Sequence, residues 1–189
     1  MFFRFKHHFG RTQRAESNFQ PERAFDLRPN DEMPLQSATP APTILDDVLA
    51  RLEIPRGNRL AVLIFFRSDC PWCASEVPRL SEVVARAAKY EMRALGVAGG
   101  SDSPQSAAQF AQEKALSFPV VADQSGELRE AFAIERVPSV VVINGAGLVE
   151  RTFEGVTEQL SGIVAQALSA VISNATPPQY NMIGNGCAP

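Results

Sequence analysis

The amino-acid sequence predicts an α/β fold with a mixed central sheet and helices on both of its faces. Three observations lead to this prediction. Apolar runs typical of strands alternate with amphipathic segments typical of helices, the run Leu60–Phe66 is continuously apolar, and the pattern closes with a predicted hairpin and a final helix. A continuously apolar strand is typical of the centre of a sheet that is covered on both faces.

The composition is that of one domain of ordinary size without an excess of basic residues. The chain has 189 residues, 45% of them apolar and 21% charged, which fits one domain with room for tails. A formal net charge of −3 lacks the footprint of a protein that binds nucleic acid. No apolar run approaches the roughly 18 residues that span a bilayer. We therefore expect no nucleic-acid partner and no membrane span, and we expect a monomer.

The pattern divides the chain into three parts. Residues 1–42 carry several prolines and no sustained period, which predicts an irregular arm and linker. Residues 43–173 form the predicted domain, and residues 174–189 are predicted to be a flexible tail. The first nine residues lack the apolar run of a signal peptide, so the sequence as written predicts a cytoplasmic protein, whereas an upstream start site would allow a periplasmic one.

The first elements of the predicted domain lead to two cysteines. A short helix is expected to begin at Thr43, whose side chain caps it, and to end before Pro55. The strand Leu60–Phe66 follows. Apolar residues at helical spacing then predict an amphipathic helix over Trp72–Lys89, and Pro78 inside it is expected to kink it.

The second half of the pattern continues the alternation. Strand Arg93–Ala98 is followed by a helix that begins at Ser103, with Pro104 in its first turn, where the missing N–H costs nothing. The remaining strands and helices are predicted over residues 119–122, 126–132, 137–143, 148–154 and 157–172, with a turn at 144–147 that joins two antiparallel strands.

Two of the three cysteines form the motif Cys70-Pro71-Trp72-Cys73 between strand and helix. A Cys at a helix N-terminus has its thiol pKa lowered from about 8.5 by unpaired N–H groups and the helix dipole, which favours the nucleophilic thiolate. The second thiol can attack a mixed disulfide formed by the first and close an internal disulfide. We therefore predict Cys70 as the attacking thiol and Cys73 as the resolving thiol, with Trp72 as an apolar contact beside the sulfur.

An isolated cysteine pair of this spacing is also found as half of a zinc site or as a structural pair. A tetrahedral zinc site needs two further ligands, and the candidates in the sequence are Cys187 near one end and His7-His8 near the other. A cysteine pair between a strand and a helix in an α/β pattern instead indicates a redox motif. We expect neither a metal nor a cofactor.

Beyond the cysteine pair, the sequence resembles the thioredoxin superfamily. The strand before the cysteines and the later Val137-Pro138 before another strand both match it. The run Cys73-Ala-Ser-Glu76-Val-Pro78-Arg-Leu80 is similar to the C-x-x-E-x-P-x-L signature of TlpA/ResA-type thiol-disulfide oxidoreductases. Residues 101–123 resemble the central helix and strand that these proteins insert. The resemblance covers residues 44–172 and implies a thioredoxin-like, redoxin-type domain.

The resemblance implies roles for three further residues. Pro138 is expected to be cis and to lie against the cysteine pair, and the backbone of Val137 is expected to pair with a bound substrate strand. Glu76, one helical turn from Cys73, is expected to accept or return the proton of the resolving thiol. The alternative for Glu76 is a solvated residue that only stabilises the helix N-terminus.

Two positions depart from the family pattern. Asp69 stands where the family commonly has a Trp, and a carboxylate beside Cys70 is expected to disfavour the thiolate. Ile64 stands where thioredoxins keep a buried acid, so that proton-transfer role is vacant.

The residues and the resemblance together predict a protein thiol-disulfide oxidoreductase. Its partners would be cysteine-containing protein clients and an upstream dithiol electron donor, with family analogy favouring reduction of the clients. A peroxiredoxin-like peroxidase is an alternative, although such enzymes place Thr or Ser where Arg67 stands. A glutaredoxin is disfavoured because Val140–Ile143 continue as apolar strand. A non-catalytic module whose cysteines sense redox state or hold a metal also stays open.

The third cysteine and several charges near the predicted site have open roles. Cys187 has three interpretations, a third redox relay, an intermolecular crosslink or an idle thiol, and we expect the idle thiol. Arg67, Asp69, Arg79 and Arg136 are candidates for a rim that selects partners, although charged residues near strand ends are usually only solvated.

Overall fold

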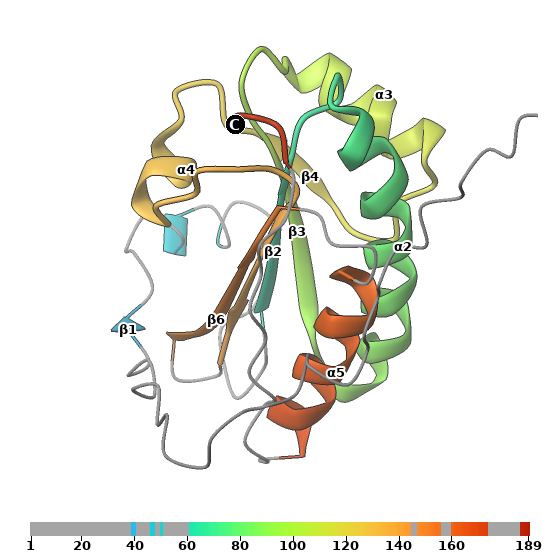
Figure 1. Ribbon diagram of the computed structural model, residues 1–189, viewed down its shortest axis with the longest axis vertical. Helices are drawn as coiled ribbons and strands as arrows, with labels where there is room; N and C mark the ends of the chain where they lie inside the picture. Colours follow the sequence, from blue (N-terminus) through green and yellow to red (C-terminus); the bar gives the residue numbers. More distant parts are fainter. Residues whose placement is uncertain are drawn as a thin grey trace, which may run out of the picture. The chain divides into compact units, whose positions relative to one another are not determined.

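A mixed sheet forms the centre of the fold (Figure 1). Within the described residues it has six strands in the order β1-β6-β5-β2-β3-β4. Their bounds are β1 Thr39–Pro40, β2 Ala61–Phe66, β3 Arg93–Ala98, β4 Val120–Ala122, β5 Ser139–Ile143 and β6 Leu148–Glu154.

The computed structural model describes residues 39–40, 46–47, 50, 61–144, 147–155, 160–173 and 186–189. All of them belong to one unit, Ser37–Pro189. Asp46, Asp47 and Ala50 are helical and fall within the first predicted helix. Thr39 and Pro40, within the predicted irregular arm, form the strand β1. The rest of that arm, the rest of the helix and residues 174–185 of the predicted tail lie outside the described residues.

Strand β2 lies between a parallel and an antiparallel neighbour. It pairs in parallel with β3, so that Phe66 lies opposite Ala98, and antiparallel with β5, so that Phe65 lies opposite Ser139. Strand β4 extends the parallel side, and β6 pairs antiparallel with β5 as the predicted hairpin requires. The antiparallel pairing brings the residues just before β5 to the same edge of the sheet as the residues just after β2.

The helices are α2 Pro71–Ala87, α3 Pro104–Glu113, α4 Glu127–Ala131 and α5 Leu160–Ile172. The helix expected over Trp72–Lys89 is confirmed, although its last turn is a 3₁₀ segment, η2 Ala88–Tyr90, which Glu91 ends with a left-handed φ of 62°. Pro78 lies inside α2 without ending it. In the part of the chain that the structure describes, no helix is long and apolar enough to cross a membrane.

The start of α3 is fixed by a reciprocal pair of hydrogen bonds. The Ser103 hydroxyl oxygen accepts from the Ser106 backbone N–H at 3.1 Å, and the Ser103 N–H donates to the Ser106 hydroxyl at 2.9 Å. Two N–H groups at the helix N-terminus are thereby satisfied. The predicted start at Ser103, with Pro104 in the first turn, is confirmed.

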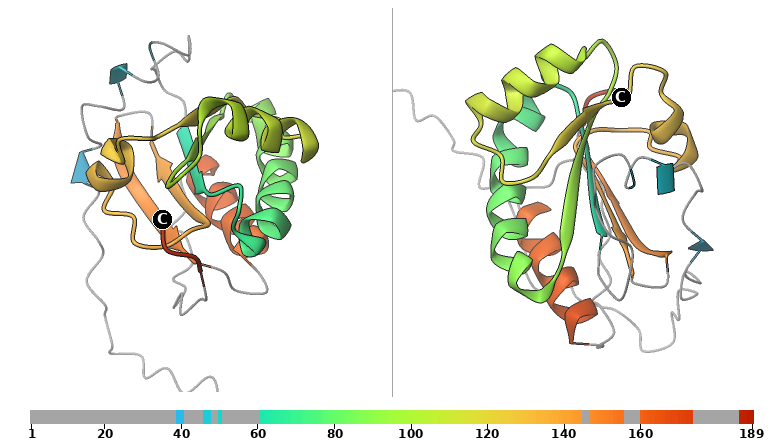
Figure 2. Two further views of the ribbon diagram at one scale, coloured as in Figure 1. Left: turned by 90° about the horizontal axis from the view of Figure 1, so that it is seen from above. Right: turned by 180° about the vertical axis from the view of Figure 1, so that it is seen from behind.

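Both faces of the sheet are covered, as the sequence predicts. Phe65 and Phe66 are neighbours on β2, so their side chains point to opposite faces. The Phe66 ring stacks on Phe110 of α3 with centroids 4.9 Å apart, and the Phe65 ring contacts Phe132, which follows α4, at 5.9 Å. Figure 2 shows α2 and α5 side by side, with α4 on the opposite side of the sheet. The predicted fold class is therefore confirmed.

Candidate active site

The cysteine motif lies at the carboxyl end of the central strand β2. Cys70 is the N-cap residue of α2, with extended backbone angles, and Cys73 lies in the first turn. Both cysteines are buried, whereas Trp72 between them is 45% exposed. The N-terminal N–H groups of α2 and the positive end of its dipole therefore lie next to Cys70, as a nucleophilic cysteine requires.

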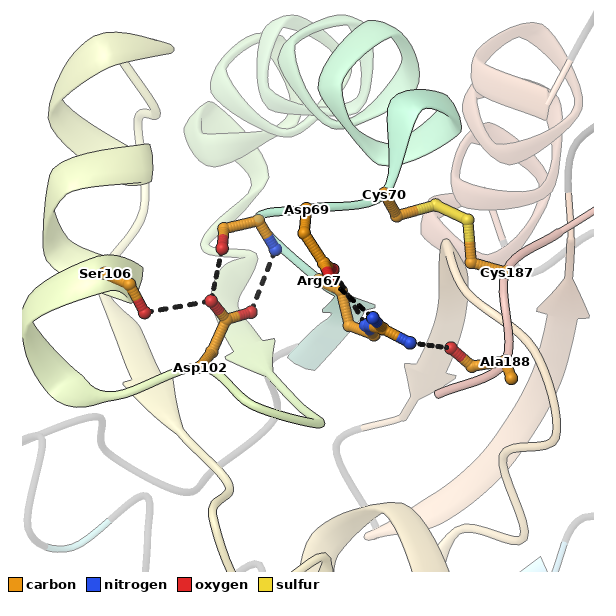
Figure 3. Close-up of polar contacts among 8 residues, drawn as sticks. Arg67, Asp69, Cys70, Asp102, Ser106, Cys187 and Ala188 are labelled. Carbon is orange, nitrogen blue, oxygen red and sulfur yellow. Dashed lines mark hydrogen bonds and ion pairs between the residues drawn. A yellow bond between two sulfur atoms is a disulfide. The ribbon is translucent and has the colours of Figure 1, made fainter.

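A buried carboxylate holds the loop that leads to Cys70. Asp102, just before α3, is buried, and its Oδ2 accepts a hydrogen bond from the backbone N–H of Ser68 at 2.9 Å (Figure 3). Its Oδ1 accepts from the hydroxyl groups of Ser68 and of Ser106, the latter at 2.9 Å. Asp102 is not among the site residues that the sequence predicts, although an acid directly before a predicted helix cap is a visible signal.

Arg67 and Asp69 form an ion pair on the exposed side of the same loop. Arg67 Nε donates to Asp69 Oδ1 at 2.9 Å and Nη2 donates to Oδ2 at 2.5 Å. The hydrogen bonds from Arg67 lower the pKa of Asp69, and those to Asp69 raise the pKa of Arg67. Because its charge is paired, Asp69 disfavours a thiolate at Cys70 less than the sequence alone predicts.

Cys73, the predicted resolving cysteine, is a buried thiol. Cys73 is 0% exposed and carries no disulfide. Burial raises its pKa from 9.0 to about 12, although a hydrogen bond from the Arg67 backbone acts in the opposite direction. Cys73 is thus protonated near neutral pH, and it must lose a proton before it can attack a disulfide.

Glu76 lies one turn further along the buried face of α2. It is 3% exposed and therefore is not the solvated residue of the alternative interpretation. Its Oε1 accepts a hydrogen bond from Arg79 Nη1 at 2.8 Å. The other oxygen, Oε2, is buried and has no hydrogen-bond partner among the described residues. A carboxylate oxygen with free acceptor capacity on the face of Cys73 fits a group that takes up a proton.

The chain end completes the site opposite the cysteine motif. The Val137–Pro138 peptide bond is cis, as the resemblance implies. Val137 N donates to Cys187 O at 2.9 Å, and Cys187 N donates to Val137 O at 2.9 Å. The two residues form an isolated antiparallel bridge. Cys187 is joined to Cys70 by a disulfide, with Cα atoms 6.2 Å apart (Figure 3).

The expectation of an idle thiol at Cys187 is therefore wrong. Pairing with Val137 delivers the Cys187 sulfur to Cys70, and no periodic pattern in the sequence marks such a single-residue bridge. Arg67 Nη1 also donates to the carbonyl oxygen of Ala188 at 2.9 Å. Of the charges expected at the rim, Arg67 contacts both the loop and the chain end, whereas Arg79 pairs with buried Glu76.

No metal site is formed by the described part of the chain. It contains no group of three or more His, Cys, Asp or Glu residues that could hold a metal ion.

Comparison with known proteins identifies relatives for this arrangement. The profile of the AhpC/TSA family matches residues 44–152. The sporulation thiol-disulfide oxidoreductase A of Bacillus subtilis is 26% identical over 120 residues, which are 62% of this chain and 73% of that protein. The thiol-disulfide oxidoreductase ResA of Halalkalibacterium halodurans is 27% identical over 100 residues, 52% of this chain and 56% of that protein. The match thus spans little more than half the length of ResA.

Solved structures share the fold at lower sequence identity. A secreted Mycobacterium tuberculosis disulfide oxidoreductase, homologous to DsbE of E. coli, is 23% identical with a TM-score of 0.53, over 60% of this chain and 83% of that one. A Xanthomonas campestris peroxiredoxin Q is 22% identical with a TM-score of 0.55, over 61% of this chain and 81% of that one. At these identities the likeness shows the thioredoxin-like fold alone.

Proposed function

Because the chain belongs to the AhpC/TSA family, we propose that it is a thiol-disulfide oxidoreductase that acts on cysteine-containing proteins. The observation that carries this proposal is the position of Cys70, at the N-cap of α2 with the free thiol of Cys73 in the next turn. The two relatives matched by sequence are thiol-disulfide oxidoreductases, which supports the same activity.

The proposed reaction has two exchange steps. The Cys70 thiolate attacks a client disulfide, so that a Cys70–client bond forms, the client disulfide breaks and one client sulfur leaves as a thiolate. Cys73 then attacks Cys70 Sγ, which forms the Cys70–Cys73 disulfide and releases the second client thiolate. The client gains two electrons and the cysteine pair loses two.

The second step needs a group that removes the proton of Cys73. Burial holds this thiol protonated, with a pKa of about 12. Glu76, on the same buried face of α2, is the proposed acceptor because its Oε2 is buried and has no hydrogen-bond partner in the described part of the chain. The proton then passes to the departing client thiolate, so that Glu76 returns to its starting state.

The proposed direction is reduction of the client, with an upstream dithiol donor restoring the two thiols. A strongly oxidising cysteine pair owes its potential to a stabilised reduced form, usually a stable thiolate. The buried, protonated Cys73 gives no such stabilisation. The reduction potential tests the direction. The fluorescence of Trp72, the single tryptophan, reports the reduction potential. A Cys187→Ser variant is used, because it isolates the Cys70–Cys73 couple from the Cys70–Cys187 disulfide. A value near about −270 mV supports a reductant, and one near about −120 mV marks a disulfide donor.

Peroxide reduction is the second candidate, since a peroxiredoxin shares the fold. Peroxiredoxins have Thr or Ser three positions before the attacking cysteine, whereas this chain has Arg67 there. The Arg67 guanidinium is bound to Asp69. The nearest hydroxyl in the loop, that of Ser68, donates to Asp102. The loop therefore supports disulfide exchange better than peroxide binding.

Turnover of a disulfide-containing protein such as insulin, with a dithiol as donor, tests the proposed function. We expect activity that Cys70→Ser abolishes and that Glu82→Gln, at an exposed position of α2, leaves intact. In a Cys73→Ser/Cys187→Ser background, the client should remain bound to Cys70 as an adduct on non-reducing electrophoresis. Absence of both turnover and adduct, with rapid consumption of hydrogen peroxide, would instead establish the peroxidase.

A further inference from the structure

The last four residues, Gly186–Pro189, lie where the proposed reaction requires a client. We propose that this segment is an internal client, so that Cys187 is a third redox-active cysteine and the surroundings of Gly186–Ala188 define the client sequence that the site accepts. The assignment to a client position rests on the proposed function. The disulfide between Cys70 and Cys187 does not depend on that function.

The backbone of Val137 provides the first contact. Its N–H and C=O both bond to Cys187, at 2.9 Å each, and Val137 is buried. Strand β5 begins two residues later, so the pairing adds one extended residue beside the end of the sheet. Main-chain pairing of this kind binds an extended peptide whatever its side chains, which is the requirement for a site that accepts several cysteine-containing proteins.

The sulfur contact gives the segment its chemistry. An oxidised client, the substrate of the proposed function, supplies the oxidant that forms the internal bond. Turnover of the client leaves the Cys70–Cys73 disulfide, and once the client has left, the Cys187 thiolate attacks Cys70 Sγ. The Cys70–Cys187 bond forms, the Cys70–Cys73 bond breaks, and Cys73 leaves as a thiolate that takes up a proton.

Release of the segment follows the same path as release of a client. Cys73 gives up its proton and attacks Cys70 Sγ, so that the Cys70–Cys73 bond forms and the Cys70–Cys187 bond breaks. Cys187 leaves as a thiolate and takes up the proton. No electrons are gained or lost overall, because the two disulfides are isomers of one oxidation state.

Gly186 and Arg67 define the sequence that the site accepts around the cysteine. A Cβ atom placed on Gly186 would lie 3.0 Å from Val137 O and 3.2 Å from Gly155 Cα, both backbone atoms that cannot turn aside. The fit therefore favours glycine before the client cysteine, since a larger residue requires these neighbours to shift. After the cysteine, Arg67 Nη1 donates to the carbonyl oxygen of Ala188 at 2.9 Å, a contact that does not depend on the side chain. The preferred client segment is extended, with Gly before Cys.

Disulfide mapping tests the internal client directly. The protein is oxidised with an excess of oxidised glutathione, digested without reductant, and the peptides that contain Cys70 are identified by mass. We expect the Cys70–Cys187 pair as a major species in the wild-type protein. Detection of the Cys70–Cys73 pair alone would overturn the proposal.

Two substitutions in the same segment test the fit. Gly186→Val should lower the ratio of Cys70–Cys187 to Cys70–Cys73 by at least about tenfold, since its Cβ meets fixed backbone. Ala188→Val is the matched control, because the Ala188 side chain is exposed, and it should leave the ratio unchanged. An equal response of the two variants would contradict the proposed specificity.

A peptide assay separates this proposal from the proposed function. Disulfide dimers of a synthetic peptide of residues 184–189, and of the same peptide with Val in place of Gly186, are offered to the Cys187→Ser variant. The glycine peptide should be reduced at least about tenfold faster. Equal rates for the two peptides would refute the proposed sequence specificity but would leave the proposed function standing. Failure to reduce any disulfide, with the Cys70–Cys187 link still mapped, would remove the function and leave a structural crosslink.

Discussion

The carboxylate of Asp102 accepts the backbone N–H of Ser68 across the loop that precedes Cys70, at a distance of 2.9 Å. Its other oxygen accepts from the hydroxyl of the same serine. One buried acid thereby satisfies two donors of a loop that has no sheet partner of its own, and it couples that loop to the first turn of α3 through Ser106. The contact holds the loop that leads to Cys70, the predicted attacking cysteine.

Replacing Asp102 should destabilise the protein more than replacing an exposed acid. Asp102→Ala leaves the Ser68 N–H and the Ser68 hydroxyl without this acceptor and removes one of the two acceptors of the Ser106 hydroxyl, and we expect the free energy of unfolding to fall by about 1 to 3 kcal/mol. Urea unfolding followed by circular dichroism measures the change. Glu82→Ala, on the exposed face of α2, should stay within about 0.5 kcal/mol of the wild type.

Gly96 on β3 should tolerate no side chain. A Cβ atom there would lie 2.9 Å from Phe118 Cε2, 3.0 Å from Val120 Cγ2 and 3.1 Å from Phe66 Cε1. Since these rings and methyls belong to the core, Gly96→Ala should cost about 1 to 3 kcal/mol in thermal or urea unfolding. Gly99→Ala is the control, because nothing lies within 4 Å of a Cβ at that position. A loss of the same size in both variants would contradict the packing argument.

Stability should fall at alkaline pH because of Cys73. Its pKa is raised from 9.0 to about 12 in the folded protein, so the unfolded chain releases this proton first as the pH rises. The contribution of the buried thiol is therefore complete below about pH 9 and declines toward pH 12, with a slope of at most about 1.4 kcal/mol per pH unit.

The measurement compares two proteins in which no disulfide can exchange. The free energy of unfolding of Cys70→Ser/Cys187→Ser is followed from about pH 8 to about pH 10.5, beside the same protein with Cys73→Ala added. The difference between the two should shrink steadily with pH above about 9. A difference that stays constant would mean that Cys73 titrates normally in the folded state.

Glu76→Gln should slow the resolution of mixed disulfides. Glutamine keeps the size of the side chain and an oxygen that accepts from Arg79, but it cannot take up the proton of Cys73. We expect a loss of about 10²-fold in the rate at which a Cys70–client adduct is resolved, measured by stopped-flow or quenched electrophoresis. The deficit should narrow as the pH rises, because hydroxide then removes the proton. A pH-independent deficit would indicate a structural role alone.

The local elements of the fold could be predicted because each has a local cause. The apolar run that ends at Phe66 specifies a strand covered on both faces, and Ser103-Pro104 specifies the start of a helix. The apolar strand that ends at Phe66 is followed by the helical spacing of Trp72–Lys89. The change between these two patterns places Cys70 at the N-terminus of α2. The strand order of the sheet was not predicted, because pairing between strands that are distant in the sequence leaves no local pattern.

The polar and covalent contacts of the site could not be predicted in the same way. Asp102 and Ser68 are 34 positions apart, and Cys70 and Cys187 are 117 positions apart. Pairing between such residues leaves no period in the sequence. The ion pair between Arg67 and Asp69 is close in sequence, but its formation depends on a loop conformation that no propensity encodes.

The Cys70–Cys187 bond also determines how much of the chain forms a closed ring. The bond closes a loop with a sequence separation of 117, which holds β3 to β6 and α2 to α5. In the chain-entropy description, a ring of this length restricts the unfolded ensemble by about 4 to 5 kcal/mol at 25 °C. Exchange to the Cys70–Cys73 bond opens that ring without any gain or loss of electrons. The same oxidation state thus exists in two topologies, one that resists unfolding and proteolysis more strongly than the other.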